Sequence, residues 1–438
     1  MGLGKVRLQE LDVVELGRRQ RPPSRRAEGL VLQRDGHRGQ TVLKGGGLTF
    51  TLDDVAYLGG GEGNAALAEV DALALTDASQ ITDIASVRAR FGDRTAVLVE
   101  TTLLRRRAKV KFADAGRWLF TREALEQATP AAVAEHRADR LTGHAVHDVT
   151  CSVGTELAAL AGRADRIVGS DVDEVRVGMA RHNVGGDGSS VLLCRADALA
   201  PVTRGTTVVA DPARRSNGRR TFDPRDYTPA LEKLLAVYAD RDLVVKCAPG
   251  IDFDQIRRLG FDGEIEVTSL GGGVREACLW SPGLTTRGVS RRATILDRAE
   301  EVTDAEPDEC PVAAPGRWIV DPDGAVVRAG LVRHYGARHG LWQLDPAIAY
   351  LSGDQLPTGV RGFEVIAELG LAERALRREL SARDVGALEI LVRGVSVDPD
   401  ELRTRLRLRG SARLSLVITR IGAGSASRTV VYLCRPSR

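Results

Sequence analysis

Long apolar segments are absent from this chain of 438 residues. No run approaches the eighteen or more uncharged apolar residues that a membrane-spanning helix needs. The first residues also lack the basic and then apolar layout of a secretion signal. We therefore expect a cytoplasmic protein with no membrane partner. A chain of this length is too long for one compact core, so we expect two or three domains.

The chain also lacks closely spaced cysteine pairs, and it contains few lysines. The six cysteines occur singly without a C-x-x-C pair, and the seven histidines do not cluster at ligand spacing. This pattern argues against a structural zinc site, and we expect no metal. Only 6 of the 62 basic residues are Lys, and the other 56 are Arg. A GC-rich genome accounts for such a bias, but Arg is also the side chain best suited to bidentate phosphate contacts.

Residues 143–282 alternate short apolar strands with glycine-containing turns and helices, a pattern that requires a parallel sheet covered on both faces. No G-x-G-x-x-G element follows the first strand, which argues against a nicotinamide dehydrogenase. Two further strands flank Gly271–Gly273 and predict a closing antiparallel hairpin. The expected strands are Ala145–Thr150, Arg166–Ser170, Val191–Arg195, Thr206–Ala210, Asp242–Lys246, Ile265–Ser269 and Glu276–Trp280.

Acidic residues lie at or just after the ends of the first four of these strands, in order. The first strand runs into a turn of small residues, which lets the backbone approach a ligand closely. Asp171, about twenty residues past that turn, is placed to accept two ribose hydroxyls, and Asp197 is placed to accept from an adenine amino group. One such acid is more often a helix cap, but four in order predict a site for S-adenosylmethionine (SAM). The expected cofactor residues are Asp148, Thr150, Ser152, Gly154, Asp171 and Asp197.

The fourth strand ends in the segment Asp-Pro-Ala-Arg-Arg, residues 211–215. It resembles the Asn/Asp-Pro-Pro-aromatic motif of amino-directed methyltransferases, and this resemblance implies that Asp211 and Pro212 lie next to the reactive methyl group and align the acceptor. No aromatic residue follows Pro212 to stack a flipped base, which disfavours N6-adenine chemistry. Arg214 and Arg215 are candidates for binding an acceptor phosphate or carboxylate, although ordinary surface charge explains them too.

Lys246 and Cys247 end the fifth strand. Lys246 is a catalytic candidate if its side chain enters the substrate cleft, and otherwise it reaches solvent from the strand end. Cys247 has the position of a nucleophile for C5-pyrimidine methylation, but a buried packing cysteine is the favoured interpretation.

The remaining regions carry weaker signals. Residues 1–45 are basic and proline-containing, and we expect a disordered arm, a start assigned too far upstream, or a nucleic-acid-binding arm. Residues 46–142 are expected to form a helical domain, and 283–355 a linker and connecting segment. Residues 356–438 predict a third unit, in which Phe363–Leu371 is expected to be a helix.

Basic residues gather in two places. The run from Arg105 to Lys111 (RRRAKVK) is either a solvated turn between helices or a patch that contacts phosphate. Residues 356–438 hold fifteen Arg against nine acids, a net charge of +6, while the whole chain has a net charge of +3. The positive charge is therefore concentrated at the end of the chain.

Over most of residues 46–438 the chain resembles a bacterial family of class I SAM-dependent methyltransferases that carry a THUMP-like C-terminal domain. The Asp-Pro-Ala-Arg-Arg segment is the most specific match. The matching segments are Phe120–Thr129, Asp148–Gly154, Asp211–Arg215, Val245–Gly250, Glu389–Gly394 and Leu416–Arg420.

The resemblance implies an α/β fold with three parts. A Rossmann-like SAM-binding domain at 143–282 would hold a mostly parallel seven-stranded sheet of order 3-2-1-4-5-7-6. A helical N-terminal region would precede it, and a small α+β THUMP-like domain at 356–438 would follow. The family implies SAM as the cofactor and RNA, either tRNA or rRNA, as the acceptor, because THUMP domains recognise structured RNA ends in tRNA-modifying enzymes.

Two alternatives stay open at this point. The protein could methylate a small molecule or a protein and use its C-terminal domain for assembly. It could also be a non-catalytic RNA-binding protein that keeps the SAM fold as a scaffold, although the intact acids at 148, 171 and 197 argue against this.

Overall fold

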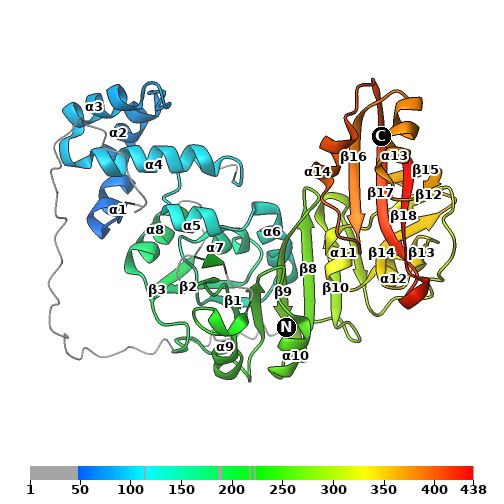
Figure 1. Ribbon diagram of the computed structural model, residues 1–438. Coiled ribbons are helices and arrows are strands. Elements are labelled where there is room, and N and C mark those ends of the chain that lie inside the picture. Colours follow the sequence, from blue (N-terminus) through cyan, green and yellow to red (C-terminus); the bar gives the residue numbers. More distant parts are fainter. Residues whose placement is uncertain (1–47, 113–114, 186–189, 217–218, 221–222, 438) are drawn as a thin grey trace, which may run out of the picture. The chain divides into compact units, whose positions relative to one another are not determined.

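The chain is described here by a computed structural model (Figure 1). The described residues are 48–112, 115–185, 190–216, 219–220 and 223–437. They fall into two compact units. The first unit runs to Asp211 and includes Lys233–Arg241, and the second comprises Pro212–Glu232 and the chain from Asp242 onward. The arm expected at 1–45 lies outside the described residues.

The first unit begins with helices, which confirms the expected helical N-terminal region. Helix α1 starts with a capping box, in which Thr51 Oγ1 accepts the Asp54 N–H at 3.1 Å and the Thr51 N–H donates to the Asp54 carboxylate at 3.0 Å. The helices are α1 (Leu52–Gly59), α2 (Gly61–Asp71), α3 (Gln80–Phe91), α4 (Thr95–Ala108), α5 (Arg122–Gln127) and α6 (Ala131–Arg140).

This helical region packs onto the rest of the first unit. Its apolar core also contains Val153 and Met179, which come from the following α/β part. Phe112, Trp118 and Phe120 stack on one another within that core, with ring centroids 5.6–6.0 Å apart. The segment after α4 is therefore tied to the α/β part by buried aromatic area.

Four parallel strands form the sheet of the first unit, in the order β4-β1-β2-β3. Val146 of β1 lies between Ile167 of β2 and Thr207 of β4. β1 and β4 are almost wholly buried, as expected for parallel strands covered on both faces. The elements are β1 (Ala145–Asp148), α7 (Thr155–Leu160), β2 (Arg166–Asp171), α8 (Glu174–Val184), β3 (Val191–Arg195), β4 (Thr207–Ala210) and α9 (Leu231–Val237).

In the second unit, the strands β7, β9, β8, β10 and β11 lie side by side in that order. β8 and β9 form the predicted antiparallel hairpin, whose turn residues Gly271 and Gly272 have φ of 63° and 70°. Apart from the two-residue strands β5 (Arg215–Ser216) and β6 (Arg219–Arg220), the strands therefore follow the expected partial orders 3-2-1-4 and 5-7-6, and the predicted fold class is confirmed. The elements are β7 (Leu243–Cys247), α10 (Phe253–Arg258), β8 (Glu264–Leu270), β9 (Gly273–Trp280), β10 (Arg291–Ile295) and β11 (Glu300–Thr303).

A second sheet of seven strands follows, in the order β13-β14-β12-β15-β18-β17-β16. Helices α13 and α14 pack on one of its faces through alternate residues of β16, β17 and β18. The other alternate residues of β17 and β18 face a separate apolar cluster that includes β12 and β14. The elements are β12 (Trp318–Val320), α11 (Gly324–Arg328), α12 (Val332–Arg338), β13 (Trp342–Asp345), β14 (Ile348–Gly353), β15 (Gly362–Leu369), α13 (Glu373–Ala382), β16 (Val385–Arg393), α14 (Pro399–Leu406), β17 (Ala412–Ile421) and β18 (Arg428–Pro436).

The helix predicted over Phe363–Leu371 is wrong, because this segment forms β15 between β12 and β18. A bulge between Val365 and Ala367 interrupts the pairing with β18. Phe363 and Val365 face one apolar cluster, and Ala367 and Leu369 face the other. These four residues occupy every second position, which is the period of a strand, and the bulge moves the later two to the other face of the sheet.

Candidate functional site

Four carboxylates lie at the carboxyl edge of the parallel sheet in the first unit. Asp148 and Asp171 are the last residues of β1 and β2, Asp211 follows β4, and Asp197 comes two residues after β3. The strand order places them as 211, 148, 171 and 197, with neighbouring strands about 4.8 Å apart. The order of the strands reverses between β1 and β4, and open α/β sheets bind ligands at such a point.

Thr150 joins two of these strand ends. Its hydroxyl accepts the Asp211 N–H at 2.6 Å, and its own N–H donates to the Asp148 carboxylate at 3.0 Å. Asp148 is buried. Thr150 occupies a slot where glycine is usual in the family it resembles, and in this chain its hydroxyl fixes the start of the Asp211-Pro212 segment instead.

Asp171 is held in a position in which its carboxylate can accept further hydrogen bonds. It is only 8% exposed, and its two oxygens accept the N–H groups of Ser152 at 3.0 Å and Asp173 at 2.9 Å. An ionised carboxylate has about four acceptor positions, so each oxygen keeps one for a ligand hydroxyl. This arrangement fits the two ribose hydroxyls of SAM. Ser152 adopts a φ of 49°, which turns its N–H toward Asp171.

Gly154 is needed for packing at the end of the same loop. Its φ is 88°, in the left-handed region that favours glycine. A Cβ at this position would lie 3.2 Å from the side chain of Val184 and 3.3 Å from that of Ala180, both on α8. Glycine therefore lets the loop from Val149 to Gly154 lie close against α8.

Asp197 is exposed and shapes a turn after β3. Its carboxylate accepts the Leu199 N–H at 2.8 Å, and the Tyr238 hydroxyl donates to the Ala198 carbonyl at 2.6 Å. The turn is therefore held from both sides, while Asp197 keeps acceptor capacity for a ligand.

Asn183 was missed by the sequence-based prediction, and the structure places it beneath the loop. Its Oδ1 accepts the Leu119 N–H at 2.7 Å, and its Nδ2 donates to the carbonyls of Leu119 and Val153 at 2.9 and 2.8 Å. One buried amide thus joins the helical region to the cofactor loop. Its partners lie 30 and 64 residues away in the chain, so a search of local motifs does not find it.

His147 was also missed. It is a buried residue of β1 whose ring nitrogens lie 2.9 Å from Thr203 Oγ1 and 3.0 Å from Ser170 Oγ. Burial, and secondarily the charge of Arg241, lowers the pKa of His147 to about 4. A histidine within an apolar strand was the available sequence signal, and it belongs to the support of the site rather than to its ligand edge.

The acceptor-side candidates, apart from Asp211, belong to the second unit. Pro212 is buried, and Arg214 donates to the Cys247 carbonyl at 3.1 Å. The side chain of Arg215 lies outside the described residues. Lys246 is a buried residue of β7 that has partners in the structure, and it is not a solvent-reaching lysine. Cys247 is fully buried and donates to the Val245 carbonyl, which supports the packing interpretation.

Membrane spans and metal clusters are both absent from the described ranges. None of their helices combines the length and apolar character that a membrane span requires. Within the same ranges, no group of three or more histidine, cysteine or acidic side chains is arranged to hold a metal ion.

Comparison with known proteins gives matches along most of the chain. A family model described as THUMP domain-like matches residues 360–436, and a domain of unknown function, DUF8688, matches residues 51–108. A protein named "uncharacterized S-adenosylmethionine-dependent methyltransferase" from Mycobacterium tuberculosis is 65% identical over 358 residues, which is 80% of this chain and 100% of that protein. A second strain of that organism has a protein that matches equally well.

The fold is also found among solved structures. A protein of Porphyromonas gingivalis W83, provisionally assigned as a methyltransferase, superimposes with a TM-score of 0.66 at 20% identity. The alignment covers 79% of this chain and 91% of that one. At this level of identity the likeness establishes the fold.

Proposed function

Because the chain belongs to a family of SAM-dependent methyltransferases, we propose that it transfers the methyl group of SAM to RNA, either tRNA or rRNA. The observation that carries this proposal is the THUMP-like match over residues 360–436. The same region holds the net charge of +6 within 356–438. RNA is a polyanion whose binding to proteins is dominated by phosphate contacts. A compact basic accessory domain suits that acceptor better than an uncharged metabolite.

The cofactor would be held at the edge of the sheet in the first unit. Asp171 would accept the two ribose hydroxyls, and Asp197 would accept from the adenine amino group. Asp148, Thr150, Ser152 and Gly154 would form and support the loop beneath the cofactor. When bound, SAM supplies an electrophilic methyl group on a sulfonium centre.

The acceptor would be aligned by residues at the end of β4. Thr150 holds the backbone N–H of Asp211, so the Asp211-Pro212 segment starts from a fixed position. Methyl transfer depends mainly on alignment of the acceptor lone pair with the methyl group. Asp211 would hold the acceptor atom, with Lys246 as a further catalytic candidate and Arg214 and Arg215 as phosphate-binding candidates.

The test is methyl transfer from labelled SAM to total RNA from a strain that lacks this protein. We expect label in one RNA size class with the wild-type protein, and labelling about 100-fold slower with Asp211→Ala because alignment is lost. SAM binding by calorimetry should survive in this variant, since Thr150 receives the backbone N–H and not the side chain. Asp240→Ala is the matched control, because Asp240 is exposed and has no interaction among the described residues.

Two outcomes would contradict the proposal. Label that enters protein or metabolites and not RNA would identify a different acceptor class. Equal labelling by Asp211→Ala and Asp240→Ala would remove Asp211 from the acceptor site.

A further inference from the structure

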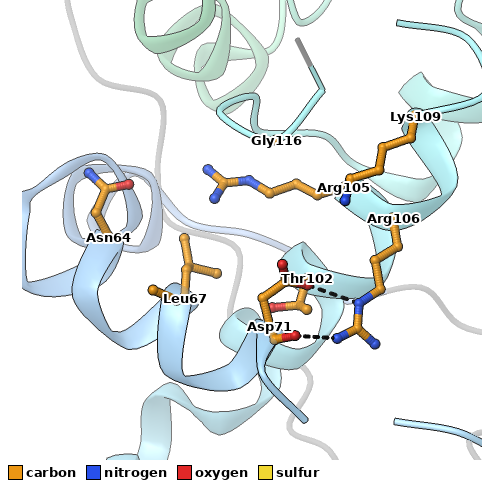
Figure 2. Close-up of a pocket in the computed structure, with 9 residues that line it drawn as sticks. Asn64, Leu67, Asp71, Thr102, Arg105, Arg106, Lys109 and Gly116 are labelled. Carbon is orange, nitrogen blue, oxygen red and sulfur yellow. Dashed lines mark hydrogen bonds and ion pairs between the residues drawn. The ribbon is translucent and has the colours of Figure 1, made fainter. Parts of the chain in front are cut away.

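A surface pocket of about 270 Å³ lies in the helical region of the first unit (Figure 2). Helices α2 and α4 each contribute four residues with the same spacing of three, four and seven positions, so each set shares one helix face. Gly116 completes the lining. The residues are Asn64, Leu67, Ala68 and Asp71 from α2, and Thr102, Arg105, Arg106 and Lys109 from α4 and its C-cap.

Two of the lining side chains are buried. Leu67 is apolar, and the Thr102 hydroxyl already donates to the Leu98 carbonyl at 2.9 Å. Neither offers an unsatisfied polar group to a ligand. Recognition in this pocket therefore depends on the charged side chains around it.

The single carboxylate of the lining is already neutralised. Arg106 forms an ion pair with Asp71 at 2.9 Å and also donates to the carbonyls of Asp71, Leu73 and Ala74. Arg106 therefore closes the end of α2 and is not available to a ligand. The remaining charges of the pocket are those of Arg105 and Lys109, both positive.

Arg105 is a partly buried cation that has no acidic partner within the described part of the chain. It donates to the carbonyls of Trp118 and Arg117 at 2.9 and 3.0 Å. Burial lowers the pKa of its guanidinium, and only the nearby charge of Asp71 opposes this. Among the described residues, neither Arg105 nor Lys109 forms an ion pair. A partly desolvated cation without a counter-charge is unfavourable, and an anion in the pocket relieves that cost.

Figure 2 shows Arg105 extended across the pocket and Lys109 directed back toward it from one turn further along. A planar guanidinium beside a mobile ammonium is a combination that suits phosphate, because the first binds two oxygens and the second adds a point charge. The volume is slightly below the about 300 Å³ at which pockets for drug-sized ligands begin. It suits one phosphate with part of its nucleotide.

The pocket is linked to the cofactor loop within the same unit. Arg105 holds the carbonyls of residues 117 and 118, the next residue is Leu119, and Asn183 bonds both Leu119 and Val153 of the loop. A phosphate bound at Arg105 would therefore be held in a fixed position relative to the loop beneath SAM.

We propose that this pocket binds a backbone phosphate of the acceptor RNA, with Arg105 and Lys109 as its ligands. The inference rests on the proposed function, because it takes the acceptor to be RNA. It gives the region matched by DUF8688, together with the turn after α4, a role in RNA binding. The basic residues between positions 105 and 109 then divide into one structural cation, two pocket cations and Arg107, which does not line the pocket.

The experiment is filter binding of total RNA, which contains both tRNA and rRNA, to the full-length protein over a series of KCl concentrations. Lys109→Ala should weaken binding roughly fivefold at 0.1 M salt and reduce the slope of log K against log salt by about one. Lys109→Arg should restore both.

Arg107→Ala is the matched control: it removes a positive charge from the same last turn of α4, and with it the same favourable interaction with the helix dipole. It should change affinity less than twofold. Lys109 and Arg107 are both exposed, so none of these variants endangers the fold.

The outcomes separate the two proposals. Absence of wild-type binding even in low salt would overturn the RNA acceptor and the pocket inference together. Wild-type binding with equal effects of Lys109→Ala and Arg107→Ala would overturn the pocket inference alone. Inorganic phosphate is the second probe. If it raises the melting temperature of the wild type but not of Lys109→Ala, while that variant leaves the affinity for total RNA unchanged, the site takes free phosphate and the RNA assignment of the pocket is overturned.

Discussion

Asn183 shows how one side chain supports a binding loop. Its amide joins Leu119 and Val153, both buried, and it is itself only 8% exposed. A buried polar group that loses its partner destabilises the fold by about 1–3 kcal/mol. Replacing this amide with an apolar group would leave three backbone groups without a partner, and one of them belongs to the cofactor loop.

We therefore predict that Asn183→Leu weakens SAM binding about tenfold and lowers the melting temperature. The physical reason is that the loop carrying Ser152 loses its anchor at Val153. Calorimetric titration with SAM measures the first effect, at a temperature where circular dichroism shows the variant to be folded. His182→Ala is the control from the same helix, because half-buried His182 makes its side-chain hydrogen bond to the Arg117 carbonyl and not to the cofactor loop. Equal SAM affinity in both variants would mean that Asn183 does not hold the loop.

His147 makes the first unit sensitive to acid. Its pKa in the folded protein is about 4, below its ordinary value of 6.5. The unfolded chain therefore binds a proton at a pH where the folded chain does not. The stability from this residue is fully present above about pH 6.5 and is lost as the pH falls toward 4.

Between pH 7 and pH 5 we expect His147 to account for a loss of about 2 kcal/mol in the free energy of unfolding. Urea unfolding followed by circular dichroism at both pH values measures this loss. His147→Gln keeps a polar group that can both donate and accept, and it removes the titration. The variant should be less stable than the wild type at pH 7, but its free energy of unfolding should fall less between pH 7 and pH 5. An identical loss in the variant would assign the acid sensitivity to other groups.

At the scale of elements, the strands of the cofactor sheet were predicted as strands, whereas the strand at 362–369 was predicted as a helix. Parallel strands buried on both faces are nearly continuous apolar runs, as in Thr207–Ala210, and the sequence places them within two residues of their ends. In β15 the apolar residues Phe363, Val365, Ala367 and Leu369 occupy every second position, which is the period of a strand. The bulge places the first two and the last two on opposite faces of the sheet. Pairing with β12 and β18, which no local pattern records, decides its structure.

The same distinction applies to the candidate site. Asp148 and Asp171 could be found because they end strands, and the parallel topology brings strand ends together. Asn183 and His147 could not be assigned, because their roles arise from contacts with residues more than twenty positions away. The acids at the ligand-binding edge of the sheet can be predicted from the order of strands along the chain. The residues that support this edge are decided by tertiary packing and cannot.

At the scale of the whole molecule, the basic C-terminal region belongs to a larger sheet than its sequence signature covers. The THUMP-like match begins at residue 360, but β12 pairs with β15 and β14 pairs with β12 in the same sheet. Ile319, Ile348 and Tyr350 from these strands share one apolar cluster with Phe363 and Val417. The segment expected to connect two domains therefore contributes both strands and core.

We predict that a fragment of residues 356–438 does not fold stably alone, whereas a fragment of residues 310–438 does. The shorter fragment leaves the edge of β15 unpaired and exposes the apolar face beneath Phe363 and Val417. Amide hydrogen exchange is the measurement. Slow exchange in β15 and β17 is expected in the longer fragment and in the intact chain, and fast exchange in the shorter one.

Slow exchange in the shorter fragment would show that β12 to β14 are dispensable. In that case the RNA-binding role proposed for the C-terminal region could be assigned to the THUMP-like segment alone. The predicted result instead makes residues 310–355 part of the folding unit that carries the basic region.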